Sequence, residues 1–521
     1  MPRTIDEYAE QRASRLSRLR VSRRNLLLAG GTAAAAGVVL GRQSFRSAGG
    51  VSGRHGLTLS GRHLAWAPDL GPAALRLTAQ LLPGPPAGLR AVVDVGDAPG
   101  VYGTPVPARI VHLLGAGSQF YVKAALTGLR PGTTYHYRIR LSDGTTTGDA
   151  HVVTAPARGS TEPFTFTAFA DVGTNAPPHP NGYAAGDPVA ARDPRPAWTQ
   201  IDRMATQRPA FTLLAGDICY ADTSGTGLGT DTFDPYVWDV FLARIDARAA
   251  YAPWMFATGN HDMEPAYGVH GYGGHAARLD LPGNGPAGCP SVYRFTHGPL
   301  GVVALDANEL SAEIRSNRGY SGGAQVRWLE DTLRTWRARP GIDFVVAFFH
   351  HCAYSTTREH ASDGGVRDAL APLFDRYQVD LAIQGHNHVM ERTDPIRAGR
   401  ATRAAPDGST VDPATDGTTY LCIGSGGRAR YSFPAPERFR DRPGPGTVDS
   451  YVWDPDGVRA PETVAWSRTR YDGYAFLAVD VRPAAPGRTT TMTLRTLADA
   501  LPGRPEPYTE IDRITLRRTA G

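Results

Sequence analysis

The amino-acid sequence predicts an α/β domain that is preceded by a small all-β domain and a charged leader. A chain of 521 residues is longer than one ordinary domain. Short β-rich runs without helical periodicity fill residues 57–154, which follow the leader. From Phe164 onward, apolar strand-like runs alternate with helical segments, which is typical of α/β architecture. We therefore expect a leader over residues 1–50, an all-β domain over 55–156 and an α/β catalytic domain over 163–519.

The composition and the distribution of charge exclude two classes of protein. Hydrophobic residues make up 41% of the chain and charged residues 20%, values of a folded protein rather than a disordered one. The net charge is +5, but residues 1–46 hold nine arginines and three acidic residues, so the rest is close to neutral. A nucleic-acid-binding protein needs its basic surface on the folded domain. We expect no nucleic acid as a structural partner.

The amino-terminal segment has the features of an export signal. Arg23 and Arg24 precede an apolar stretch over Leu26–Leu40 that is rich in alanine and interrupted by glycines. A membrane-spanning helix needs about 18–20 strongly apolar residues, so this stretch predicts no stable span. Paired arginines before a weakly hydrophobic core resemble the twin-arginine signal. We expect a secreted or cell-envelope protein; the alternatives are an uncleaved anchor and a disordered basic arm.

The all-β region is predicted from alternating and β-branched runs. The expected strands are Val92–Val95, Arg109–His112, Gln119–Ala125 and Tyr135–Leu141. The segment Leu126–Tyr137 resembles the "L-x-P-x-T-x-Y-x-Y" corner of fibronectin type III domains. We therefore predict a small fibronectin III-like β-sandwich, which is followed by a linker over residues 155–163.

The α/β region is predicted from buried apolar runs and from helical periodicity. The expected strands are Phe164–Phe169, Ala210–Leu214, Pro253–Ala257, Phe344–Phe349, Val379–Ile383, Thr418–Ile423 and Tyr474–Val481. The expected helices are Trp198–Gln207, Pro235–Arg248, Gly323–Arg337 and Val366–Tyr377. Gly/Pro-rich segments over 398–415 and 429–462 are expected to be lids or surface loops.

Five polar motifs follow directly after five of these strands. They are Asp171-Val172-Gly173, Gly216-Asp217-Ile218-Cys219-Tyr220, Gly259-Asn260-His261-Asp262, His350-His351 and Gly385-His386-Asn387-His388. Ligands of open α/β sheets bind beyond the carboxyl ends of the strands, so the motifs are expected to meet at one rim. Imidazole and amide donors suit a divalent metal, and a phenolate suits ferric iron. Two adjacent metal ions can clamp a phosphate and activate water.

The ordered set of motifs resembles the purple acid phosphatase branch of the calcineurin-like metallophosphoesterases. The pattern of that branch is D-x-G, G-D-x-x-Y, G-N-H-(D/E), (A/V)-x-x-H and G-H-x-H, and the resemblance covers Phe164 to Arg392. The tyrosine of the second motif distinguishes this branch from its relatives. A β-sandwich in front of the catalytic domain also matches the plant and actinobacterial members. The resemblance implies a metallophosphoesterase β-sandwich flanked by helices, in four layers (α/β/β/α).

The resemblance also implies a binuclear metal centre of Fe(III) and a divalent ion (Fe, Zn or Mn). The ferric ion is implied to bind Asp171, Tyr220 and His388. The divalent ion is implied to bind Asn260, His350 and His386. Asp217 is implied to bridge the two ions.

Two histidines outside the ligand set are expected to act on the substrate. His261 corresponds to the phosphate-binding histidine of the family. The family has further histidines about ten residues after the position of His350, where this chain has Arg358-Glu359-His360. His360 therefore matches one of them, and Glu359 stands in place of the other. His261 or His360 is expected to protonate the leaving group.

The resulting hypothesis is an exported, acid phosphatase-like enzyme. It hydrolyses phosphomonoesters by attack of a metal-bound hydroxide, and a small phosphoester is the expected partner. The first alternative is a phosphodiesterase or nucleotide-cleaving enzyme with Mn or Zn in both sites. The second is a binding protein whose catalytic domain has decayed. The sequence leaves the oligomeric state and a role for His351 open, and its four cysteines show no metal-binding spacing.

Overall fold

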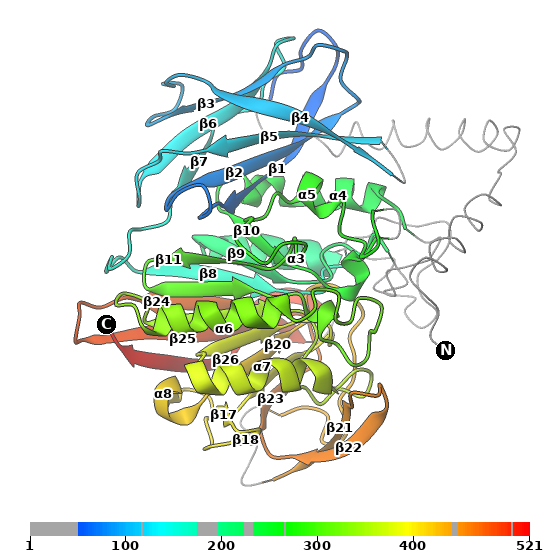
Figure 1. Cartoon of the computed structure of the whole chain (residues 1–521), viewed down its shortest axis with the longest axis vertical. Helices are drawn as coiled ribbons and strands as arrows, with labels where there is room; N and C mark the ends of the chain where they lie inside the picture. The colour runs from blue at the N-terminus through cyan, green and yellow to red at the C-terminus, as the bar shows by residue number, and fades with distance from the viewer. Residues whose placement is uncertain are drawn as a thin grey trace, which may run out of the picture. The chain divides into compact units, whose positions relative to one another are not determined.

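The computed structural model describes most of the chain after the leader (Figure 1). The described residues are 50–115, 118–173, 195–222, 233–264, 267–439, 446–501 and 504–521. Apart from Gly50, the predicted leader therefore lies outside them. No helix within these ranges is long and apolar enough to cross a membrane.

The amino-terminal region is all β, and its strands are hydrogen-bonded in the order β1-β2-β5-β4-β3-β6-β7. Their bounds are β1 (Thr58–Trp66), β2 (Leu75–Leu82), β3 (Ala91–Gly96), β4 (Val106–Leu114), β5 (Ser118–Leu126), β6 (Thr134–Leu141) and β7 (Ala150–Val153). β4 changes partner along its length, because Val106–Ala108 pairs with β3 and Arg109–Leu114 pairs with β5. The four strands predicted here are confirmed as parts of β3 to β6.

Most strands in the remainder of the described chain lie in two sheets, each with seven strands. One has the order β10-β9-β8-β24-β25-β26-β19, and the other has the order β11-β12-β13-β15-β20-β16-β23. The first contains β8 (Phe164–Phe169), β9 (Phe211–Ala215), β10 (Trp254–Ala257), β19 (Thr410–Val411), β24 (Ala475–Arg482), β25 (Thr489–Leu501) and β26 (Arg504–Thr519). The second contains β11 (Tyr293–His297), β12 (Leu300–Ala304), β13 (Phe344–Phe349), β15 (Leu381–Gln384), β16 (Met390–Thr393), β20 (Thr419–Ile423) and β23 (Ser467–Tyr471).

Few helices accompany these sheets. They are α3 (Arg195–Thr206), α4 (Tyr236–Ala249), α5 (His275–Arg278), α6 (Ala324–Arg337), α7 (Gly364–Tyr377) and α8 (Pro413–Asp416), with short 3-10 turns η1 (Asn260–Asp262) and η2 (Ala307–Glu309). The fold class is thus mixed α/β and rich in sheet. The four helices predicted from the sequence correspond to α3, α4, α6 and α7 and are confirmed, with boundaries that differ by up to three residues.

The alternation of side chains along each strand explains how the sheets are packed. Phe166 of β8 belongs to one hydrophobic cluster with Val346 of β13, so one face of each sheet contributes to a shared core. Phe169 instead packs in a cluster with Trp238 of α4. In the second sheet the alternate residues pack with α6 and α7, as with Ala347 of β13. These contacts bury both faces of the central strands.

Parallel pairing places the ends of the predicted strands together. β8, β9 and β10 are parallel neighbours in one sheet, and β12, β13, β15 and β20 are parallel neighbours in the other. Parallel neighbours present their carboxyl ends at the same edge of a sheet. All five strands that precede a polar motif are confirmed: β8, β9, β10, β13 and β15.

The two segments expected to be lids or surface loops contain short strands, which corrects part of that prediction. Within residues 398–415, β18 (Arg400–Ala401) pairs with β17 (Ile396–Arg397), and β19 pairs with β26. Within residues 429–462, β21 (Val448–Trp453) pairs with β22 (Arg459–Val464) and with β14 (Ser362–Asp363). These strands are short or polar, so they lack the apolar runs on which the prediction depended.

Candidate metal centre

The polar motifs begin where the chain leaves the strand ends, and the backbone there is unusual. Asp171, Asp217, Tyr220 and His386 have φ angles of 58°, 51°, 61° and 67°. Residues other than glycine rarely adopt this left-handed conformation, and such strain concentrates at functional sites.

Glycines next to these residues allow the motifs to approach one another. A Cβ atom on Gly216 would lie 2.5 Å from Nδ1 of His350, and one on Gly259 would lie 2.0 Å from Oδ1 of Asp217. Asp262 joins the same two motifs, since its carboxylate accepts hydrogen bonds from the backbone N–H of Ile218 (3.0 Å) and of Gly259 (2.8 Å). Asp262 therefore has a structural role in this arrangement.

One half of the site is formed by Asp171, Tyr220 and His388. The Tyr220 hydroxyl lies 3.0 Å from Oδ1 of Asp171 and 2.9 Å from Nε2 of His388. Potential ligand atoms of Asp171, Asp217 and His388 all lie within 4.8 Å of one another. Carboxylate, phenol and imidazole donors therefore converge on one small volume.

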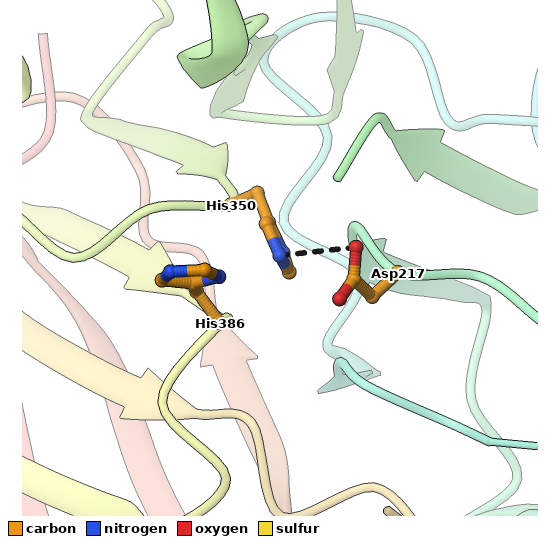
Figure 2. A group of neighbouring side chains, drawn as sticks. All are labelled: Asp217, His350 and His386. Atoms are coloured by element: carbon orange, nitrogen blue, oxygen red, sulfur yellow. Dashed lines mark ion pairs between the residues drawn. The ribbon is translucent and has the colours of Figure 1, made fainter. Parts of the chain in front are cut away.

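The other half is formed by Asp217, Asn260, His350 and His386. Nε2 of His350 lies 3.1 Å from Oδ1 of Asp217 (Figure 2). The same atom lies 3.1 Å from Oδ1 of Asn260. Ligand atoms of Asp217, His350 and His386 form a second group within 4.8 Å. Asp217 is common to both groups. The structure thus brings together all seven residues that were expected to be ligands, and all seven are buried.

The hydrogen bonds of the buried histidines fix which ring nitrogen faces the site. Nδ1 of His350 lies 2.9 Å from the carbonyl oxygen of Ala215, and Nδ1 of His388 lies 2.6 Å from that of Ala429. A carbonyl oxygen only accepts, so in both rings Nδ1 donates a proton, and Nε2 is the nitrogen that faces the other site residues. Histidines that bind metals usually have this kind of orienting partner. The donor set therefore fits a metal centre.

The pKa shifts of the buried groups also fit a site that binds cations. Burial raises the pKa of Asp171 to about 8; the nearby Asp217 carboxylate contributes to the rise, and His350 opposes it. Burial lowers the pKa of His386 and of His388 to about 3. Both rings are therefore neutral, and each can offer a nitrogen lone pair to a metal ion. Burial and the neighbouring Asp171 raise the pKa of the Tyr220 hydroxyl. Cations at this position would offset the repulsion between the carboxylates.

The two histidines expected to act on substrate lie at the rim of the site and remain partly exposed. The side chains of His261 and His360 are 17% and 24% exposed, unlike the buried candidate ligands. His261 donates its backbone N–H to Oδ1 of Asp217 (2.9 Å), and its ring lies 4.3 Å from that of Tyr220. A partly exposed imidazole beside a buried polar cluster can contact a bound substrate.

Three residues near the site were not singled out by the motifs: Glu313, Arg428 and Tyr431. The guanidinium of Arg428 lies 4.2 Å from the centre of the Tyr220 ring, and the Tyr431 ring stacks on His388 at 4.0 Å. The sequence contains one feature that marks the segment of Arg428 and Tyr431 as close to the site, namely the glycines within residues 424–427. A Cβ atom on Gly426 would lie 1.9 Å from the carbonyl oxygen of Ala170.

His351 and the cysteines do not join the candidate ligands. His351 is buried, and neither of its ring nitrogens has a hydrogen-bond partner among the described residues. Its ring lies 4.3 Å from that of His386, but it belongs to neither group that shares Asp217. The four cysteines are buried free thiols, in agreement with their lack of metal spacing.

Comparisons with known proteins relate the chain to phosphoesterases. Residues 164–390 match the family model of the calcineurin-like phosphoesterases. The uncharacterized protein Rv2577 of Mycobacterium tuberculosis is 34% identical over 418 residues, 76% of each chain. Purple acid phosphatase 21 of Arabidopsis thaliana is 29% identical over 236 residues, 44% of this chain and 47% of that protein. The purple acid phosphatase from yellow lupin seeds has a similar fold, with a TM-score of 0.63 and 19% identity over 89% of this chain and 75% of that chain.

The fold, the site and these relatives define a metal-dependent phosphoric ester hydrolase that is similar to acid phosphatases. Residues 164–390 of the chain are a calcineurin-like phosphoesterase domain, and the relatives that the chain resembles include purple acid phosphatases. This domain and these relatives imply a binuclear metal centre, for which the structure offers the candidate residues described above.

Proposed function

We propose that this protein hydrolyses phosphomonoesters at a binuclear metal centre built from the seven buried residues at the strand ends. The observation that carries the proposal is that the two candidate ligand groups share Asp217. A carboxylate common to two groups of donors is the arrangement needed to bridge two cations. Two metal sites about 3.5–4 Å apart are typical of phosphatases.

Each half of the centre has its own donors. Asp171, Tyr220 and His388 would hold Fe(III), because a phenolate and a carboxylate suit a small, highly charged ion. Asn260, His350 and His386 would hold the divalent ion, Fe, Zn or Mn. Asp217 would bridge the two.

When bound, the two cations supply charge neutralisation for the phosphoryl oxygens and a lowered pKa for water. The protein supplies orientation and the proton. His261 faces the half of the site that contains Tyr220, where it can hold a phosphoryl oxygen. His360 faces the half that contains His386, since the two rings lie 4.2 Å apart. We assign the protonation of the leaving group to His360.

The domain organisation and the export of the protein belong to the same proposal. The end of β7 at Val153 and the start of β8 at Phe164 support a boundary between a fibronectin III-like domain over 55–156 and a catalytic domain over 163–519. The clusters that join both sheets and the helices support the four-layer α/β/β/α arrangement. The twin-arginine-type sequence supports a leader over 1–50 and a secreted or cell-envelope location.

To test this proposal, the full-length protein is expressed, its metal content is determined and its activity is assayed. The rates on p-nitrophenyl phosphate and on bis(p-nitrophenyl) phosphate are compared, together with the iron, zinc and manganese content and the visible spectrum. We expect a higher kcat/KM for the monoester, two metal ions per chain and a charge-transfer band. A preference for the diester with Mn or Zn in both sites would replace this proposal by the phosphodiesterase or nucleotide-cleaving alternative.

A further inference from the structure

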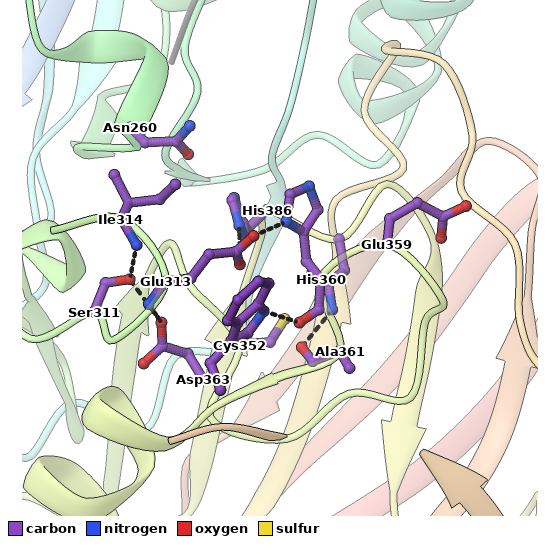
Figure 3. A network of polar contacts seen from close by, with 12 residues as sticks. Asn260, Ser311, Glu313, Ile314, Cys352, Glu359, His360, Ala361, Asp363 and His386 are labelled. Atoms are coloured by element: carbon purple, nitrogen blue, oxygen red, sulfur yellow. Dashed lines mark hydrogen bonds and ion pairs between the residues drawn. The ribbon is translucent and has the colours of Figure 1, made fainter. Parts of the chain in front are cut away.

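A carboxylate that belongs to none of the polar motifs lies between two of the site histidines. Oε1 of Glu313 is 2.6 Å from Nδ1 of His360, and Oε2 is 3.3 Å from Nε2 of His386 (Figure 3). The Glu313 side chain is 11% exposed. The ligand atoms of these three residues also lie within 4.8 Å of one another. Glu313 thus joins a candidate metal ligand to the residue assigned to protonate the leaving group.

The loop that carries Glu313 is held in place by Asp363. The Asp363 carboxylate accepts hydrogen bonds from Oγ of Ser311 (2.6 Å) and from the backbone N–H of Ala312 (2.9 Å) and Glu313 (3.2 Å). It also caps α7 by accepting from the backbone N–H of Val366 (3.1 Å). Asp363 follows His360 by only three residues in the sequence. One buried carboxylate therefore fixes the position of Glu313 relative to His360.

The neighbouring acidic residue, Glu359, has a different partner. Its carboxylate accepts from the backbone N–H and the hydroxyl of Ser432, and Figure 3 shows it turned away from His386. The β21–β22 hairpin holds the backbone of the same segment. Trp453 donates its Nε1–H to the carbonyl oxygen of His360 (2.8 Å). The backbone beside the His360 ring is thus fixed on one side, and Glu313 is the carboxylate that contacts the ring.

We propose that Glu313 is a positioning residue that sets the tautomers of His360 and His386 together. The inference rests on the proposed function. An ionised carboxylate only accepts, so His360 donates Nδ1–H and His386 donates Nε2–H to it. His386 then keeps the lone pair of Nδ1 for the divalent ion, as in carboxylate–histidine–metal arrangements. In His360, Nε2 is then the atom that exchanges protons. It lies 3.2 Å from the hydroxyl oxygen of Tyr431.

The proton transfer follows from this arrangement. As the bond between phosphorus and the leaving oxygen breaks, the proton on Nε2 of His360 moves to that oxygen. The water-derived oxygen forms the new bond to phosphorus, and the leaving group departs as a neutral alcohol. The imidazole becomes neutral with Nδ1–H still donated to Glu313, so the ring keeps its orientation for the next proton from solvent.

The experiment compares Glu313→Gln and His360→Ala, with Glu359→Gln as the matched control. The kcat and KM of each metal-loaded protein are measured with an aryl phosphate, whose leaving group needs little protonation, and with an alkyl phosphate, whose leaving group needs a proton. Metal affinity is measured separately by competition with a chelator. For Glu313→Gln we expect kcat on the alkyl ester to fall by about 10²-fold, with a much smaller change on the aryl ester. We also expect affinity for one of the two ions to fall by about 10- to 100-fold.

His360→Ala should give the same difference between the two esters, and the double variant should be no slower than His360→Ala alone. Glu359→Gln should leave the ratio of the two rates and the metal affinity unchanged. Equal losses of kcat on both esters, or unchanged metal affinity in Glu313→Gln, would overturn the proposal. If the wild-type protein hydrolyses neither ester, the proposed function fails, and the chelator competition still decides whether Glu313 orients His386.

Discussion

The buried floor of the site and its rim are built in different ways. We use "floor" for Asp171, Asp217, Tyr220, Asn260, His350, His386 and His388. We use "rim" for His261, Glu313, His360 and Tyr431. Every floor residue follows the end of a parallel strand and is buried. The rim residues are partly exposed and belong to loops or to the short turn η1.

The difference shows which part of the enzyme the sheets themselves determine. Floor side chains are aimed by backbone geometry, including the left-handed conformations of Asp171, Asp217 and His386. Rim side chains are oriented mainly by hydrogen bonds from other side chains, as in the pair of Glu313 and His360. We therefore expect changes in the floor to remove metal and activity together. Changes at His261, His360 and Tyr431 in the rim should alter catalysis more than metal binding, whereas Glu313 should affect both because it contacts His386.

Asp217→Asn should give the largest effect. The carboxylate common to both ligand groups is lost, so we expect activity to fall by about 10³-fold or more, as when a main electrostatic group is removed from an active site. Metal content should fall at both positions in the same sample. Asp202→Asn is the control, because Asp202 is half exposed and forms a surface ion pair with Arg244. An Asp217→Asn protein with two metal ions and full activity would contradict the assignment of the floor.

The adjacent residues His350 and His351 offer a sharper test within the floor. His350→Ala should lower activity by about 10²-fold and deplete the divalent ion, since its Nε2 contacts both Asp217 and Asn260. His351→Phe should retain the metal, because no ring nitrogen of His351 is hydrogen-bonded among the described residues. Elemental analysis and kcat of the two variants decide the matter. Equal metal loss in both would place His351 among the ligands.

Tyr220→Phe should have a smaller effect on the rate and a clear effect on the spectrum. Removal of the phenol leaves Asp171 and His388 in place, so we expect about a 10-fold loss of activity. Any charge-transfer band in the visible region should disappear. Tyr431→Phe is the matched control, since Tyr431 stacks on His388 but lies outside the ligand groups. A band that persists in Tyr220→Phe and vanishes in Tyr431→Phe would exchange the roles of the two tyrosines.

The floor was predictable from the sequence because each motif directly follows an apolar run. The strand and its ligand are adjacent in the chain, as with Phe169 and Asp171, and parallel strands end at a common edge. The rim depends on distant contacts. Glu313 lies 47 residues before His360, in a loop without a motif of its own, so its contact with His360 arises only from the folded chain.

The same distinction applies to the fold. The apolar strands of the central sheets were predicted almost to the residue, as with β8 and β13. The long hairpin of β25 and β26 was not, although it lies between β24 and β19 in the first sheet. In β25 the buried residues Met492 and Leu494 alternate with threonine and arginine, so the strand contains no continuous apolar run. The β-branched threonines favour the extended conformation of this strand instead.

The smallest expected effect is a pH dependence of stability that differs between the metal-free and the metal-loaded protein. The unfolded chain releases the Asp171 proton near pH 3.8 and the His350 proton near pH 6.5. In the metal-free fold, burial raises the pKa of Asp171 to about 8. Burial lowers the pKa of His350, but the nearby charge of Asp217 outweighs it and raises the pKa to about 10. Between pH 6.5 and 8 the folded state therefore holds protons that the unfolded state has lost.

Stability must fall as pH rises through this window, by up to about 1.4 kcal/mol per pH unit for each retained proton. Bound cations replace these protons, so the metal-loaded protein should lack this component of the pH dependence. We expect the melting temperature of chelator-treated protein to decrease from pH 6.5 to 8 more steeply than that of loaded protein in matched buffers. The difference between the two curves cancels the titration of every group remote from the floor. Parallel curves would show that the carboxylates and imidazoles of the floor do not exchange protons for metal.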